Sequence, residues 1–184
     1  MDVHNDVVLS PWREDWGKIF SDEKDKIIFT LEENGHHADV YHVGGTSING
    51  MMSKPIIDIL VCPGRQLPLD SCITDLVGIG YQSLGECGRP GRYFFSKGDQ
   101  PNQTFYLHLC YDNNKVARDQ LLFQRIEQEN PDVCRQYMTM KLMLKSLFPD
   151  NRYLYRQLKG IFIEGVLAAW GMYCEIEFQR GRGI

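Results

Sequence analysis

The segment HVGGTSINGMMSKPIIDILV, residues 42–61, gathers several residue types that could do chemistry close together. Gly44 and Gly45 are followed directly by Thr46 and Ser47. Glycine has no Cβ, so backbone N–H groups and the two hydroxyls could approach an anion closely. The pattern predicts a phosphate-binding turn, although a simple tight turn would have the same sequence.

Two charged residues follow this turn. Lys54 could offer a point charge to a phosphate, or it could be a solvated loop residue. Asp58 stands in an apolar run, where a carboxylate is costly unless it faces a polar cleft or a partner. Its oxygens could hold Mg²⁺. The segment therefore raises the hypothesis of a metal-assisted phosphate site.

Composition and charge restrict the class of protein. With 184 residues, 43% of them hydrophobic, the chain is expected to fold as one globular domain. A net charge of −4 gives no general attraction to nucleic acid, so a nucleotide or another small anionic metabolite is the expected partner. The start of the chain is polar and acidic, and no apolar run is long enough for a membrane span, which favours a cytoplasmic protein. The six cysteines lack CxxC spacing and are interpreted as buried, reduced thiols.

The pattern of elements predicts an α+β fold in a single domain, residues 1–184. A small mixed sheet with flanking helices is expected over about residues 1–112, followed by a C-terminal helical lobe over about residues 113–184. A cleft between sheet and lobe would be the natural ligand site. Helices are predicted over 15–35, 71–81, 115–130, 131–148 and 151–178, and strands over 39–44, 56–62, 92–98 and 103–112.

The segment at residues 42–61 resembles the signature of the GrpB family, close to H-[IV]-G-S-T-[SA]-[VI]-x-G-[ML]-x-x-K-P-I-I-D-[IL]. This chain has Gly45 in place of the usual serine and Asn49 in place of the usual proline. The resemblance continues through RYFF, FYLHLC, ARDQLLFQRI, YMTMKLML and YLYRQLKGIFIE, and so spans nearly the whole chain. The residues that match the signature are Gly44, Thr46, Ser47, Gly50, Lys54, Pro55 and Asp58.

The GrpB family is similar to the nucleotidyltransferase superfamily, which implies a nucleotidyltransferase-like fold with a glycine turn, a strand bearing Asp-x-Asp and a third acid on a neighbouring strand. In that superfamily the acids bind two metal ions. Alternate strand residues share a face, so the partner of Asp58 is expected at position 60, where this chain has Leu60. His108 alternates into a similar place on the third strand and could face Asp58. An Asp and a His suit Zn²⁺, Mn²⁺ or acid–base chemistry better than Mg²⁺, while His108 could also be a hydrogen-bonded core residue.

Three further residues match family positions. Arg92 corresponds to the family's arginine before an aromatic pair, and its guanidinium could grip a phosphate. Tyr137 and Lys141 lie four residues apart on one predicted helix face and match a family Y-x-x-x-K repeat. They could close over a nucleotide, or they could simply pack at the boundary of the lobe.

Three functional hypotheses follow. The first is a transferase of a nucleotidyl or phosphoryl group to a small acceptor, with Asp58 and His108 as catalytic and metal-binding residues and a nucleoside triphosphate as substrate. The second is a non-catalytic nucleotide- or anion-binding module that lacks the second carboxylate. The third is an interaction partner whose apolar segment GVLAAWGMYCEIEF docks to another protein. The sequence leaves the acceptor, the nucleotide, the metal and the oligomeric state open.

Overall fold

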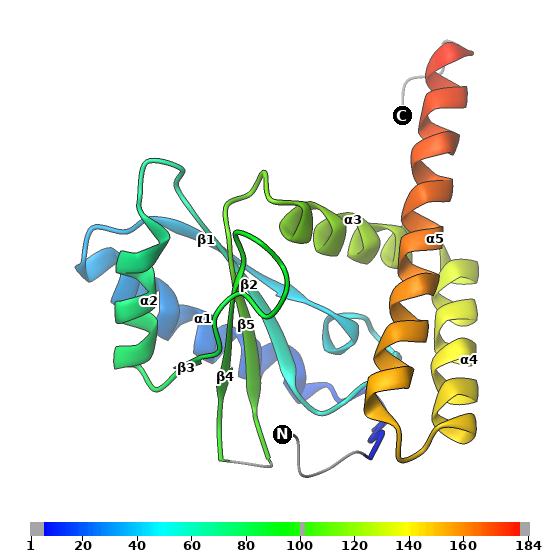
Figure 1. The fold of residues 1–184 in the computed structure, drawn as a ribbon, viewed down its shortest axis with the longest axis horizontal. Helices are drawn as coiled ribbons and strands as arrows, with labels where there is room; N and C mark the ends of the chain where they lie inside the picture. The colour runs from blue at the N-terminus through cyan, green and yellow to red at the C-terminus, as the bar shows by residue number, and fades with distance from the viewer. Residues whose placement is uncertain (1–5, 100–101, 181–184) are drawn as a thin grey trace. The chain divides into compact units, whose positions relative to one another are not determined.

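The computed structural model describes residues 6–99 and 102–180 (Figure 1). Its contacts divide the chain into two compact units. One comprises Leu9–Gln124 and is called the sheet unit below. The other comprises Met1–Val8 and Arg125–Ile184 and is called the helical unit. The two units are described separately.

Five strands within the described residues form one mixed sheet in the order β1-β2-β5-β4-β3. The strands are β1 (Ala38–Val43), β2 (Ile57–Pro63), β3 (Gln82–Ser83), β4 (Tyr93–Lys97) and β5 (Phe105–Leu109). β2 and β5 run parallel, and the other neighbouring strands run antiparallel. Both strands that carry Asp58 and His108 are therefore interior, as the apolar character of their sequences predicts.

One face of the sheet carries the main core. The side chains of Ile57, Ile59 and Val61 from β2 are almost fully buried there, together with Leu107 from β5. They pack with apolar residues of α1 (Asp15–Glu33) and α2 (Leu69–Gly78). Burial of such side chains is the main stabilising term of the unit.

The opposite face of the sheet carries a smaller apolar cluster. Leu60 and Cys62 of β2 and Cys110, just after β5, pack there with Val116 and Ala117. The last two residues lie in the first turns of α3 (Lys115–Glu129). The alternation of β2 thus divides its side chains between two apolar layers, which explains why its sequence is so uniformly hydrophobic.

A buried ion pair joins α1 to the sheet. The carboxylate of Glu23 is 1% exposed and accepts a hydrogen bond from Lys97 Nζ of β4 at 2.5 Å. The Tyr81 hydroxyl donates to the same carboxylate at 3.1 Å. Burial raises the pKa of Glu23, but the hydrogen bonds and charge of Lys97 and the other donors outweigh it and leave the pKa lowered. No local sequence pattern indicates this contact, because Lys97 and Glu23 are 74 positions apart.

The helical unit contains the end of α3, α4 (Pro131–Leu147) and α5 (Arg152–Gln179). Pro131 occupies the first helical turn of α4, as its fixed φ favours. α4 and α5 lie side by side, joined by a short connection at residues 148–151 (Figure 1). None of the described helices combines the length and the apolar character needed to cross a membrane.

The predicted α+β class and the order of the long elements are confirmed. Two short elements were not predicted, the 3₁₀ turn η1 (Gly45–Ser47) and the two-residue strand β3. Both are too short to leave a periodic pattern in the sequence. The predicted single-domain organisation stays a prediction.

Candidate functional site

The glycine turn follows β1 in the sheet unit. Gly44 has φ of +71°, a backbone conformation that favours glycine, and it leads into η1. Within this turn the Ser47 N–H donates to the carbonyl of Gly44, and the Ile48 N–H donates to that of Gly45. The first N–H groups of such a turn have no partner within it, so those of Gly45 and Thr46 are the ones that could meet an anion.

The hydroxyl of Thr46 is used inside the protein. Thr46 is 3% exposed, and its Oγ1 lies 2.9 Å from His42 Nε2. The His42 ring stacks on Phe20 of α1 with ring centroids 4.6 Å apart. Burial lowers the pKa of His42 to about 4, so the ring is neutral at pH 7 and can accept the threonine proton. This contact fixes the turn against β1 and α1.

Gln124, which sequence reasoning missed, holds the same turn from α3. Its Nε2 donates to the His42 carbonyl at 2.8 Å and to Ser47 Oγ at 2.9 Å. Ser47 Oγ in turn donates its single proton to the Gly44 carbonyl at 2.6 Å. Backbone N–H groups, rather than the two hydroxyls, are therefore the donors that the turn can offer to a ligand. A glutamine 77 positions from the serine it contacts leaves no local sequence signal.

Asp58 lies directly against Gly44. Gly44 directly follows Val43, which pairs with Asp58 at the end of the β1–β2 ladder. A Cβ built on Gly44 would lie 2.6 Å from Asp58 Oδ2, closer than real atoms allow. Asp58 is half-buried, in contrast to its nearly inaccessible neighbours Ile57 and Ile59. The structure thus brings the predicted carboxylate and the predicted turn together.

The second carboxylate of the superfamily pattern is replaced by a buried apolar side chain. Leu60, two residues after Asp58 on the same face of β2, is 0% exposed. In the register of β2 with β5, Asp58 pairs with Tyr106 and Leu60 pairs with His108. His108 therefore shares the face of Asp58 but stands across from the leucine, one step further along the strands.

His108 lies beside cationic and aromatic side chains. Its Nδ1 is 3.5 Å from Arg92 Nη1, and its ring centroid is 5.1 Å from that of Phe94. The Arg92 guanidinium is 5.0 Å from the Phe94 ring, and Arg92 is 4% exposed. Burial first, and then the charges of Arg92 and Arg89, lower the pKa of His108 to about 3. At pH 7 the ring is neutral, a state that suits a ligand or hydrogen-bond acceptor better than a proton donor.

These residues do not fit a two-metal centre. Among residues 6–99 and 102–180, no group of three or more His, Cys, Asp and Glu side chains could hold a metal ion. Asp58 supplies one carboxylate and Leu60 supplies none. A lone carboxylate can still contact a Mg²⁺ ion that arrives with a nucleotide, because Mg²⁺ is commonly bound by one or two carboxylates together with substrate phosphates.

Lys54 lies in the loop that leads into β2 and is half-buried. The preceding residue, Ser53, forms a two-way backbone bridge with Ser10, with N–H to carbonyl distances of 2.8 and 3.0 Å. This bridge fixes the loop immediately before the lysine. The assignment of Lys54 to phosphate binding remains a prediction.

Tyr137 and Lys141 lie on one face of α4 in the helical unit, where they are 5% and 4% exposed. The lysine Nζ is 5.2 Å from the tyrosine ring, which stacks on Phe162 of α5 with centroids 5.5 Å apart. Lys141 and Lys159 favour the ionised form of Glu127, a buried residue of α3. These contacts account for packing of the two residues, and their proposed part in nucleotide binding stays a prediction.

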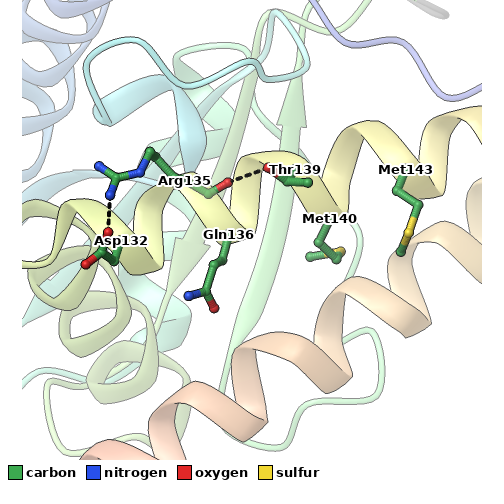
Figure 2. A pocket seen from close by; sticks show the side chains of 6 residues that line it. All are labelled: Asp132, Arg135, Gln136, Thr139, Met140 and Met143. Atoms are coloured by element: carbon green, nitrogen blue, oxygen red, sulfur yellow. Dashed lines mark hydrogen bonds and ion pairs between the residues drawn. The ribbon is translucent and has the colours of Figure 1, made fainter.

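A depression on another face of α4 was not expected from the sequence. It is lined by six residues of this helix, Asp132, Arg135, Gln136, Thr139, Met140 and Met143 (Figure 2). Arg135 pairs with Asp132 at one end, and the two methionines form the apolar end. None of the predicted site residues lines this depression.

Comparison with known proteins identifies the family. The model of the GrpB protein family matches residues 6–169, which is most of the chain. This chain belongs to the GrpB family. It is 30% identical over 160 residues to the UPF0157 protein YqkA of Bacillus subtilis strain 168, covering 86% of this chain but 45% of YqkA. The chain therefore spans less than half the length of that relative.

Solved structures support the same family and its fold. The crystal structure of the conserved protein GrpB from Enterococcus faecalis is similar with a TM-score of 0.75 and 28% identity, covering 89% of this chain and 99% of that one. Cid1 in complex with its short product ApU is similar with a TM-score of 0.50 and 12% identity, covering 71% of this chain and 41% of Cid1. The GrpB chain thus has the nucleotidyltransferase-like fold that the resemblance implied.

Proposed function

We propose that this GrpB protein binds a nucleoside triphosphate as its magnesium complex, at the glycine turn and Asp58. The observation that carries the proposal is the contact between the Asp58 carboxylate and Gly44, which has no room for a Cβ. The turn proposed to bind an anion and the oxygen proposed to bind a cation are thereby adjacent. This combination suits a ligand that contains both a phosphate chain and a divalent cation.

Electrostatics make the metal complex a better ligand than bare phosphate. The carboxylate of Asp58 would repel a phosphate held by the N–H groups of Gly45 and Thr46. A Mg²⁺ ion between the two groups converts this repulsion into attraction on both sides. Arg92 and Arg89 add positive charge beside His108, one step along the same face, which supports the binding of an anion in this region.

Nucleotidyl or phosphoryl transfer to a small acceptor is the second candidate, favoured by the nucleotidyltransferase-like fold and the retained Asp58. Against it stands Leu60, which removes the oxygen ligands on which a second metal ion depends. Release of pyrophosphate from a nucleoside triphosphate, in the presence of small hydroxyl-bearing acceptors, would support transfer. Binding without release would support the binding module.

A charge-neutralising variant of Asp58, compared with and without metal, tests the proposal. Isothermal titration of the full chain with ATP, CTP, GTP and UTP, each with and without Mg²⁺, is expected to show binding of at least one magnesium complex. In Asp58→Asn, the magnesium complex should bind at least tenfold more weakly, whereas the metal-free triphosphate should bind as well or better, because the repelling charge is gone. Weaker binding of both forms, or equal binding of the magnesium complex, would contradict the assigned role of Asp58.

Two glycines provide a matched pair of variants. Gly44→Ala places a Cβ against the Asp58 carboxylate and strains a positive φ. Gly50→Ala strains a similar φ of +77°, but nothing lies within 4 Å of its new Cβ. Both should lose about 1–3 kcal/mol of stability from backbone strain, and only Gly44→Ala should also weaken binding of the magnesium complex. Equal loss of binding in the two variants would mean that strain, and not the contact with Asp58, explains the effect.

A further inference from the structure

Three aromatic side chains of the sheet unit lie together on one face of the sheet. They are Phe94 of β4 and Tyr106 and His108 of β5, and they are called the aromatic surface below. The ring centroid of Phe94 is 5.2 Å from that of Tyr106 and 5.1 Å from that of His108. All three residues are half-buried, whereas the neighbouring Phe95 and Leu107, which face the main core, are 0% exposed. Part of each residue of the aromatic surface therefore remains accessible.

The aromatic surface continues the proposed nucleotide site across the sheet. Asp58 pairs with Tyr106 in the parallel ladder, and paired residues of neighbouring strands point to the same face. Gly44 lies on the other side of Asp58, directly after the residue with which Asp58 pairs on β1. Because neighbouring strands are about 4.8 Å apart, Tyr106 stands roughly 10 Å from the glycine turn. An extended nucleoside triphosphate is longer than this distance, so its two ends can contact the turn and the aromatic surface together.

Contacts within the aromatic surface restrain its central ring. Phe94 lies between the two rings of β5, and the Arg92 guanidinium is 5.0 Å from its ring centroid. Arg92 is itself 4% exposed, so it is held in the protein and not on a mobile side chain. A side chain that is already ordered loses little conformational entropy when a ligand packs against it. Every nucleobase has a flat π-face that can stack on an aromatic side chain. The aromatic surface therefore suits a planar ring.

We propose that the aromatic surface binds the base of the nucleotide whose magnesium triphosphate lies at the glycine turn and Asp58. The inference rests on the proposed function, because it places the other end of the same ligand. The metal–phosphate end provides affinity that all triphosphates share. Stacking on Tyr106 and Phe94 adds affinity only for a ligand that carries a base. Stacking reads no hydrogen-bond pattern, so both purines and pyrimidines bind, and the larger purine rings bind more tightly.

Magnesium tripolyphosphate separates the two ends of the ligand, because it has the phosphate chain without a base. Isothermal titration of the full chain compares it with the magnesium complexes of ATP, CTP, GTP and UTP. The parent protein should bind its preferred nucleotide about tenfold more tightly than tripolyphosphate. Tyr106→Leu should bind that nucleotide about tenfold more weakly than the parent and bind tripolyphosphate equally well. Tyr106→Phe retains the ring and should bind the nucleotide within about twofold of the parent.

Tyr93→Leu is the matched control. Tyr93 precedes Phe94 on β4 and packs against the main core on the opposite face, so its loss should leave the binding of both ligands unchanged. Circular dichroism checks the fold of each variant, and Phe94→Leu replaces Tyr106→Leu if the latter does not fold.

The outcomes distinguish this inference from the proposed function. Unchanged nucleotide binding in Tyr106→Leu, equal weakening of nucleotide and tripolyphosphate, or an equal loss in Tyr93→Leu would overturn the role of the aromatic surface alone. Equal affinity of the parent for the nucleotide and tripolyphosphate would do the same. If the parent bound none of the magnesium complexes, the proposed function would be wrong, and this inference with it.

Discussion

Replacement of Glu127 by glutamine should stabilise this protein, and more so as the pH rises. Glu127 lies in α3 of the helical unit and is 4% exposed. Its Oε1 has no hydrogen-bond partner among the described residues. Burial raises the pKa of its carboxyl from 4.5 to about 7, although Lys141 and Lys159 lower it in part. Ionisation of the folded protein is therefore less favourable than ionisation of the unfolded chain.

The magnitude follows from proton linkage. Between pH 4.5 and about 7 the folded protein keeps a proton at Glu127 that the unfolded chain releases. Because the folded pKa is the higher one, the stabilising contribution is complete below the unfolded pKa and is lost as pH rises through the folded pKa. With about 1.4 kcal/mol per pKa unit, the contribution of Glu127 falls by about 2.5 kcal/mol between pH 5 and pH 8. Glutamine, which stays neutral, avoids this loss.

Urea unfolding at pH 5 and pH 8, followed by circular dichroism, measures the difference. Glu127→Gln should be close to the parent at pH 5 and about 2–3 kcal/mol more stable at pH 8. The control is Glu164→Gln on exposed α5 surface, which should stay within about 0.5 kcal/mol of the parent at both pH values. Comparison with the parent at each pH removes the contributions of other titrating groups.

A destabilising effect of Glu127→Gln at pH 8 would refute this reasoning. It would mean that the ionised carboxylate gains more from its two lysine neighbours than it loses by burial. A gain of equal size at pH 5 and pH 8 would also contradict it, since packing rather than charge would then explain the change.

Three further perturbations follow from contacts in the sheet unit. Lys97→Met leaves the buried carboxylate of Glu23 without its main cation and should cost about 3–5 kcal/mol in urea unfolding. Gln124→Ala removes the hydrogen bonds to the His42 carbonyl and to Ser47 Oγ and should cost about 1–3 kcal/mol, with weaker binding of the magnesium nucleotide in titration. Arg65→Ala breaks an exposed pair with Asp112 and should change stability by less than about 1 kcal/mol, so a larger effect in the same assay would contradict the exposed environment.

Long elements of this fold could be predicted because their patterns are periodic. α1 was predicted over 15–35 and spans Asp15–Glu33, since its apolar residues repeat with the helical period. Gly35, with φ of +76°, stops it, and its N–H donates to the Glu32 carbonyl as expected at a helix end. η1 and β3 carried too few residues for any period to appear.

The site was predictable to the extent that its residues are close in sequence. Gly44 lies 14 positions before Asp58 and directly follows Val43, which pairs with Asp58, so the return of β2 beside β1 brings the two residues together. Gln124 comes from another element, and its role depends on tertiary packing that no local pattern encodes. The offset of His108 from Asp58 depends on the register of β2 with β5, which alternation alone leaves undetermined.

The packing around Leu60 restricts how this fold could accommodate two metal ions. An aspartate at this position would place an unpaired charge between Val43 and the first turn of α3, where Val116 and Ala117 close the layer. Such a variant would be expected to hold its new carboxyl protonated, and thus unable to coordinate a cation, until that helical turn moved away. Binding of a second metal ion on this face would therefore require several residues of the apolar layer to change together with Leu60.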